Sequence, residues 1–109
     1  MAAINRTLTI LQDGTDSEIV EALELAPRVS ILIMSPAGLV EATKVQVAPN
    51  PSGTFIDLQT DGVDVTLVAG KATQITILGG ACWKLKAATV AADRVFRVIA
   101  NRIGEPYLP

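Results

Sequence analysis

A chain of 109 residues is long enough for one domain with its own hydrophobic core and too short for two. It has no histidine and a single cysteine, Cys82, which excludes an internal disulfide and leaves a cysteine nucleophile without its usual base. The net charge is −2 and the lysines and arginines are scattered, which argues against nucleic acid as a partner, because phosphate binding needs a concentrated basic surface.

Short segments with alternating apolar and polar residues follow one another along the chain. A period of two is typical of β-strands, and Gly, Pro, Asn and Asp residues separate the segments. The apolar residues are mainly Val, Ile, Leu and Ala, a composition suited to a pleated, half-buried surface. The predicted strands span residues 6–12, 19–25, 28–34, 40–47, 54–59, 63–68, 72–78, 82–87 and 94–100.

Two segments also have features of short helices. In residues 17–25, Glu18, Glu21 and Glu24 recur at every third position, which would form an acidic stripe on a helix. Residues 86–93 are rich in alanine, the best helix former. Helix and strand remain alternatives at both places.

The connections between the predicted strands are short, and strands joined by short connections are antiparallel. Strands at intervals of roughly 8–12 residues are typical of sandwiches and barrels. The sequence therefore predicts an all-β fold: an antiparallel, jelly-roll-like β-sandwich of about eight or nine short strands with extended terminal arms.

The segment 28–34 is apolar on both of its faces. Val29, Ile31 and Ile33 form one face, and Leu32 and Met34 make the other face apolar as well. Such a strand is either central in a core or in contact with another chain. Leu32 and Met34 are therefore candidate interface residues.

The two ends are predicted to differ from the sandwich domain, which is assigned to residues 1–100. Residues 101–109 contain Gly104, Pro106 and Pro109, and proline donates no hydrogen bond to a sheet, so they are predicted to form an extended arm. Tyr107 and Leu108 in this arm are apolar groups without a core of their own, and they are further interface candidates. Residues 1–6 are predicted to form a second arm.

Two pairs of aspartates have the spacing Asp-x-x-Asp, namely Asp13 with Asp16 and Asp61 with Asp64. Carboxylates of this kind supply oxygen ligands to hard cations, but neither pair is followed by the further acidic positions of a calcium loop. Asp and Gly also form tight turns unaided. A turn is the preferred interpretation, and no metal site is predicted.

Trp83 lies between Cys82 and Lys84 and has two possible roles. It either fills the core, as most tryptophans do, or forms an exposed platform for a sugar or a protein partner. We retain it as a candidate interface residue. Cys82 is expected to be a small buried residue.

No catalytic residue, cofactor or nucleotide site is predicted. Gly79-Gly80 lacks the Lys-Ser/Thr that completes a phosphate-binding loop, and no titratable pair stands out for acid–base chemistry. The first residues lack the pattern of a signal peptide, and no apolar run reaches the ~18 residues of a membrane span. Synthesis in the cytoplasm without membrane attachment is the expectation.

Four stretches of the chain stand out together: Val45-Gln46-Val47, Gly53-Thr54-Phe55-Ile56-Asp57-Leu58, Ala69-Gly70-Lys71 and Ala92-Asp93-Arg94-Val95-Phe96-Arg97-Val98. In these stretches the chain resembles small virion accessory proteins of tailed phages, the decoration or cement proteins of phage heads. The shared motifs are structural, and no functional residue is carried over from them.

The resemblance implies a non-enzymatic virion protein, made in the host cytoplasm, that decorates or cements a capsid lattice through edge strands and terminal arms. Its expected partners are the major capsid protein or other virion subunits, with self-association into a homo-oligomer. The alternative is a carbohydrate- or receptor-binding β-sandwich, which would need an exposed aromatic platform at Trp83, Phe55 or Tyr107.

Deletion of residues 104–109 tests the predicted C-terminal arm. We expect the melting temperature of the isolated chain to stay nearly unchanged, because an arm contributes little to the core, while binding to particles weakens. Thermal denaturation and co-sedimentation measure the two effects. Unfolding of the truncated chain would contradict the prediction.

Overall fold

The computed structural model describes residues 4–21 and 28–103, and within these ranges it contains strands and no helix. No helix there is long and apolar enough to span a membrane. The strands are β1 (Ile4–Ile10), β2 (Val20–Glu21), β3 (Arg28–Met34), β4 (Thr43–Ala48), β5 (Ile56–Asp57), β6 (Gln59–Thr60), β7 (Val63–Asp64), β8 (Thr66–Leu67), β9 (Ala72–Leu78), β10 (Cys82–Ala87) and β11 (Arg94–Ile103).

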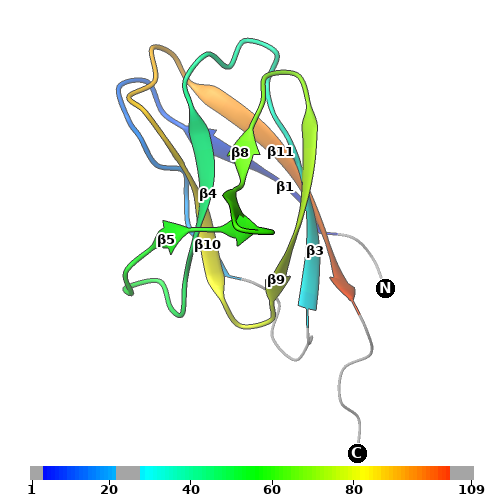
Figure 1. The fold of residues 1–109 in the computed structure, drawn as a ribbon. Coiled ribbons are helices and arrows are strands. Elements are labelled where there is room, and N and C mark those ends of the chain that lie inside the picture. Colours follow the sequence, from blue (N-terminus) through cyan, green and yellow to red (C-terminus); the bar gives the residue numbers. More distant parts are fainter. Residues whose placement is uncertain (1–3, 22–27, 104–109) are drawn as a thin grey trace, which may run out of the picture.

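Two antiparallel sheets pack against each other (Figure 1). Sheet A has the order β1-β11-β3-β9, and sheet B has the order β2-β10-β4-β5, with β8 also paired to β4. Strands β6 and β7 pair only with each other, as a separate hairpin. The prediction of an all-β antiparallel sandwich is confirmed.

The strand pairs are nested along the chain. β1 pairs with β11, β2 with β10, β3 with β9 and β4 with β8. The chain therefore forms one long hairpin with the β6–β7 hairpin at its tip, and the two halves of this long hairpin are rolled up together. Rolling of this kind produces the two interleaved sheets of a jelly roll.

The core lies between the sheets and is formed by alternate residues of each strand. β3 shows the rule most clearly, because Val29, Ile31 and Ile33 are buried while the residues between them are partly exposed. Trp83 of β10 and Phe96 of β11 are the largest fully buried side chains. The two sheets are thus joined by aliphatic packing around two aromatic rings.

The predicted Asp-Gly turn at the tip is confirmed. Asp61 and Gly62 have φ values of 54° and 79° and connect β6 directly to β7. Positive φ at both central residues characterises the type I′ hairpin turn, in which Asp-Gly is a preferred pair. Asp13, in the other Asp-Gly turn, also has a positive φ, of 69°.

Several predicted boundaries are wrong. The segments 54–59 and 63–68 are each split, because the Leu58 N–H donates to Val45 O of β4 and the Val65 N–H donates to Leu58 O, which turns the residues between them outward as a hairpin. The alternative helix over 86–93 does not form. β10 continues to Ala87, and Val90 beyond it is buried in the core.

The predicted arms are shorter than expected. β11 continues to Ile103, with Asn101 opposite Ser30 of β3, because no proline interrupts the strand before position 106. Ile4, Asn5 and Arg6 belong to β1 and pair with β11. Residues 1–3 and 104–109, with Tyr107 and Leu108, lie outside the described ranges, as does the end of the predicted strand 19–25.

Substitution of Phe96 by Ala tests the importance of the inter-sheet core. We expect a loss of ~3–5 kcal/mol in unfolding free energy, because the cavity forms at a side chain without solvent contact. Val95→Ala on the outer side of the same strand is the control and should change stability by less than ~1 kcal/mol. Urea denaturation measures both variants, and equal losses would contradict this assignment of the core.

Candidate interaction surface

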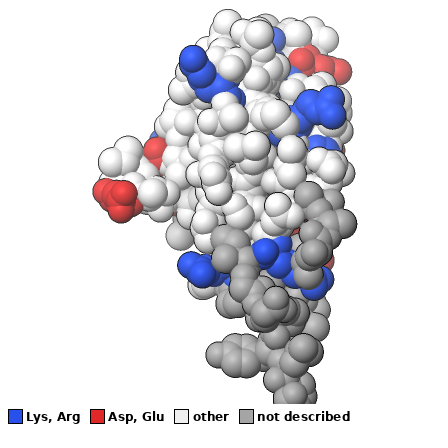
Figure 2. All heavy atoms as spheres, turned by 90° about the vertical axis from the view of Figure 1, so that its right-hand side faces the viewer, with Lys and Arg blue, Asp and Glu red and all other residues white. Residues whose placement is uncertain are grey.

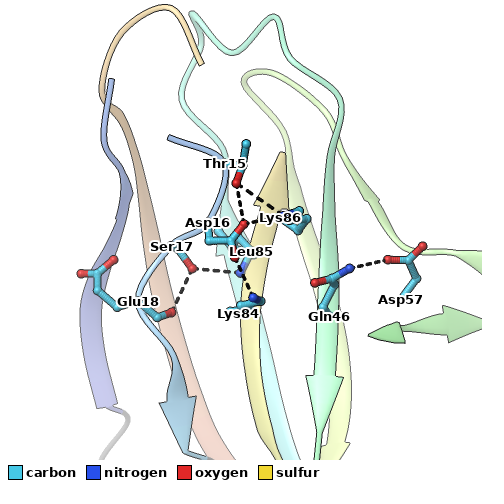
Figure 3. A network of polar contacts seen from close by, with 9 residues as sticks. All are labelled: Thr15, Asp16, Ser17, Glu18, Gln46, Asp57, Lys84, Leu85 and Lys86. Carbon is cyan, nitrogen blue, oxygen red and sulfur yellow. Dashed lines mark hydrogen bonds and ion pairs between the residues drawn. The ribbon is translucent and has the colours of Figure 1, made fainter. Parts of the chain in front are cut away.

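The outer side of sheet B is covered by ion pairs made within the chain. Asp16 lies at its centre, with its two carboxylate oxygens 2.7 Å from Lys84 Nζ and 2.9 Å from Lys86 Nζ (Figure 3). The preceding Thr15 hydroxyl donates to the same carboxylate at 2.8 Å. These contacts hold residues 15 and 16 across β10.

Backbone contacts align this segment with β10. The Ser17 N–H donates to Leu85 O at 3.0 Å, and the Leu85 N–H donates to the Ser17 hydroxyl at 2.9 Å. Partial burial acts to raise the pKa of Asp16, but hydrogen bonds from Lys84 and Lys86 outweigh it and hold the pKa well below its ordinary value. The charge of the Asp16 carboxylate is thus balanced by two lysines of the same chain.

A second set of ion pairs lies where the β6–β7 hairpin meets β4. Lys44 Nζ is 2.8 Å from Asp64 Oδ2 and 3.5 Å from Asp57 Oδ2. A hydrogen bond to Asp64 is the largest cause of the raised pKa of Lys44. Asp64 and Asp16, one member of each Asp-x-x-Asp pair, are therefore bound to lysines. In residues 4–21 and 28–103, no three metal-ligating side chains come together.

A further ion pair joins Glu41, in the loop before β4, to Arg94, the first residue of β11. Arg94 Nε and Nη2 donate to the two Glu41 carboxylate oxygens at 2.8 and 3.1 Å, a two-bonded geometry that strengthens the pair. The Ala91 N–H donates to the same carboxylate. The hydrogen bond from Arg94 is the main cause that lowers the pKa of Glu41 to about 2.

The outer side of sheet A has a different chemistry. Every charged residue in its four strands is an arginine, although the whole chain is acidic: Arg6, Arg28, Arg94, Arg97 and Arg102. By strand register, Arg28 and Arg97 are the arginines of sheet A that point to the outer face. Arg6, Arg94 and Arg102 stand at inward positions, and Arg94 is also paired with Glu41. Figure 2 shows the middle of this side without charged atoms, with Lys and Arg atoms above and below it.

The middle of this outer face is apolar. Leu32 lies between Ile99 of β11 and Gln74 of β9, and Met34 lies between Arg97 and Ala72, all in register across three strands. Leu32 and Met34 are partly exposed in the isolated chain. They lie on the face of β3 opposite to the buried Val29, Ile31 and Ile33, and their contact with another chain stays a prediction.

A shallow depression of about 330 Å³ lies on this face beside β1. Its lining consists of Asn5, Arg6, Thr7, Met34, Arg97, Val98 and Ile99, and among them Arg97, Met34 and Ile99 stand at outward positions. Cationic and apolar groups are therefore side by side in one surface feature. Arginine beside apolar residues is the composition enriched in protein interfaces.

The edge of sheet A at β1 is only partly covered. The Thr9 N–H donates to Glu18 Oε1 at 2.7 Å, so it points away from β11. Alternate residues of an antiparallel strand point the same way, and the N–H and C=O groups of Asn5 and Thr7 therefore also face outward. Within the described ranges these groups have no hydrogen-bond partner, which leaves a short stretch of open edge.

The predicted aromatic platform is not available at Trp83. Its side chain is 1% exposed and packs in the core, where it also lines a recess of about 150 Å³ between β1 and β2. Phe55 is half-buried, with Lys84 Nζ 4.6 Å from its ring centroid. Cys82 is buried, and burial raises its thiol pKa, which makes it a poor nucleophile.

Comparisons with known proteins add no relative. No protein-family model matches the chain, and neither the curated proteins nor the solved structures include a match. The candidate surface is accordingly defined by its geometry alone.

Sequence reasoning missed the two features that accompany Leu32 and Met34. The exclusively arginine charge of sheet A becomes visible only when strands remote in the chain are assigned to the same sheet. The open edge of β1 also depends on which strands are central. Counting acidic and basic residues separately in each predicted strand would show which strands carry only arginine.

Glu41→Gln tests the pair with Arg94. Because folding lowers the pKa of Glu41 from 4.5 to about 2, the unfolded chain takes up a proton first as the pH falls. The stabilisation is therefore complete above about pH 4.5 and decreases progressively towards pH 2. Urea denaturation at pH 7 should show Glu41→Gln to be less stable than wild type. When the same measurement is repeated at lower pH, this difference in unfolding free energy should shrink between pH 4.5 and pH 2.5.

Asp61→Asn is the control, because in the described structure its carboxylate has no cationic partner. Its stability difference from wild type should change less over the same pH range. An equal cost of Glu41→Gln at every pH would contradict the assignment.

Proposed function

We propose that this chain is a non-enzymatic structural protein of a tailed-phage virion, which decorates or cements the capsid lattice. Its binding surface is the outer face of sheet A, together with the open edge of β1. The terminal segments add further contacts. The major capsid protein or another virion subunit is its partner.

The observation that carries this proposal is the uneven distribution of charge between the two outer faces. On sheet B, the carboxylates of Asp16, Asp57 and Asp64 are satisfied by lysines of the same chain. On sheet A, Leu32 and Met34 lie on a face with arginines and without carboxylates. When a partner covers an apolar strip flanked by arginines, the removal of the apolar surface from water favours binding.

The jelly-roll topology supports the same proposal by analogy. This architecture occurs in viral capsid domains and also in lectins, so topology alone does not separate the two functions. A lectin-like module would bind sugars on an exposed aromatic ring, but Trp83 is buried and Phe55 is stacked with Lys84. A structural role in a lattice is therefore the function that the surface supports best.

Quantitative mass spectrometry of purified particles from the encoding phage tests this function directly. A decoration protein is expected in many copies per particle, in a constant ratio to the major capsid protein. Purified chain added to particles that lack it should co-sediment with them to saturation. Absence from the particles, or presence in only a few copies, would refute the decorating role.

Leu32→Glu tests the binding face. A charge in the middle of the apolar strip should weaken co-sedimentation with particles at least about tenfold, since burying an unpaired carboxylate is costly. Val68→Glu, at an exposed apolar residue that follows β8, is the matched control and should bind like wild type. Equal binding of both variants, with circular dichroism confirming that both are folded, would exclude this face.

A further inference from the structure

The β6–β7 hairpin projects from the body of the sandwich. Figure 1 shows it in front of the two sheets, in the green part of the chain between β5 and β8. In Figure 2, where the front of Figure 1 lies at the left, the surface projects on that side and has acidic atoms at its tip. The hairpin pairs with no other strand, and two-stranded hairpins alone are only marginally stable in water.

The tip of this hairpin combines one free charge with one exposed apolar residue. The Asp61 side chain is exposed and makes no ion pair within the described ranges, whereas Asp57 and Asp64 share Lys44. Val63, two positions later, is 68% exposed. The tip therefore presents a carboxylate and an aliphatic group to a partner.

The depression beside β1 offers the complementary groups. Arg97 supplies a guanidinium group at an outward position, and Met34 and Ile99 supply an apolar wall in the same recess of about 330 Å³. A carboxylate facing the arginine and a valine facing the apolar wall would satisfy both surfaces at once. The Glu18 carboxylate already accepts a hydrogen bond from the same edge at Thr9.

The two surfaces lie at opposite edges of sheet A. The hairpin borders a groove with Thr73 and Gln74 of β9, one edge strand, while the depression is beside β1, the other edge strand. Their contact therefore joins different molecules head to tail, and it repeats until a ring closes or a chain extends. A symmetric contact of two β1 edges is disfavoured, because it would bring arginines of both copies together.

We propose that copies of this chain self-associate head to tail, with the β6–β7 hairpin tip of one copy seated in the depression beside β1 of the next. Asp61 pairs with Arg97 of the neighbour, and Val63 packs against Met34 and Ile99. The biological role of this self-association rests on the proposed virion function. The association itself needs no capsid, so a negative result for self-association is distinguishable from a negative result for capsid binding.

Sedimentation velocity of the purified full chain at increasing concentration tests the contact. Wild type should show a mass that rises above the 11.4 kDa monomer. Asp61→Arg and Arg97→Asp should each weaken association about tenfold or more. An equimolar mixture of the two variants should regain assembly, because each hairpin then meets a depression of opposite charge.

Two matched controls separate this effect from a general change of charge or turn. Asp13→Arg changes the other Asp-Gly turn, where Asp13 also has a positive φ, and Arg28→Asp changes the second outward arginine of sheet A. Both should associate like wild type. A monomeric wild type up to about 1 mM, controls as weak as the test variants, or a mixture without recovery would each overturn the proposal.

Cysteine pairing tests the direction of the contact in a Cys82→Ala background. Oxidation of an equimolar mixture of Thr60→Cys and Thr7→Cys chains, which both keep Asp61, should give mixed disulfide dimers in preference to dimers of either variant alone. Efficient dimers of Thr60→Cys alone would show a symmetric hairpin contact and would overturn the head-to-tail arrangement.

Discussion

The nested pairing of β1 with β11 is the constraint on which the rest of the structure depends. It places Ile4 opposite Ala100 and makes β11 a central strand between β1 and β3. The pairs β2–β10, β3–β9 and β4–β8 are nested within it towards the tip. The same arrangement buries Phe96 and Trp83 between the sheets and leaves the β6–β7 hairpin as the only element without a sheet to join in the described ranges.

Folding also separates the charges. The segment with Asp16 and the segment with Asp57 and Asp64 lie over sheet B, so their carboxylates meet lysines of β4 and β10. The strands of sheet A contain no acidic residue, and of their arginines Arg28 and Arg97 point outward without an ion pair in the described ranges. One outer face is thereby satisfied within the molecule, and the other keeps its apolar strip and its arginines for a partner, the basis of the proposed structural role.

The candidate surface was only partly predictable. Leu32 and Met34 are candidates by sequence because a strand that is apolar on both faces needs an apolar neighbour on each face. The strand register places these two residues on the outer face of sheet A. Trp83 is a candidate interface residue by sequence because a tryptophan can form an exposed platform for a partner, yet alternation along β10 turns it inward. Tyr107 and Leu108 lie outside the described ranges. Arg97 and the open edge of β1 depend on strand order, which local patterns do not encode.

The sequence by itself determined the strands and several of their turns. The segments 28–34, 72–78 and 82–87 have the observed bounds, and Asp61-Gly62 forms the expected tight turn, because side-chain alternation and positive φ are local properties. Only the tertiary structure decided that β11 continues beyond residue 100, that Val90 enters the core without a helix, and that the arginines gather on one sheet. These outcomes depend on pairing between residues remote in the chain, whose free energy arises from packing that a local pattern does not contain.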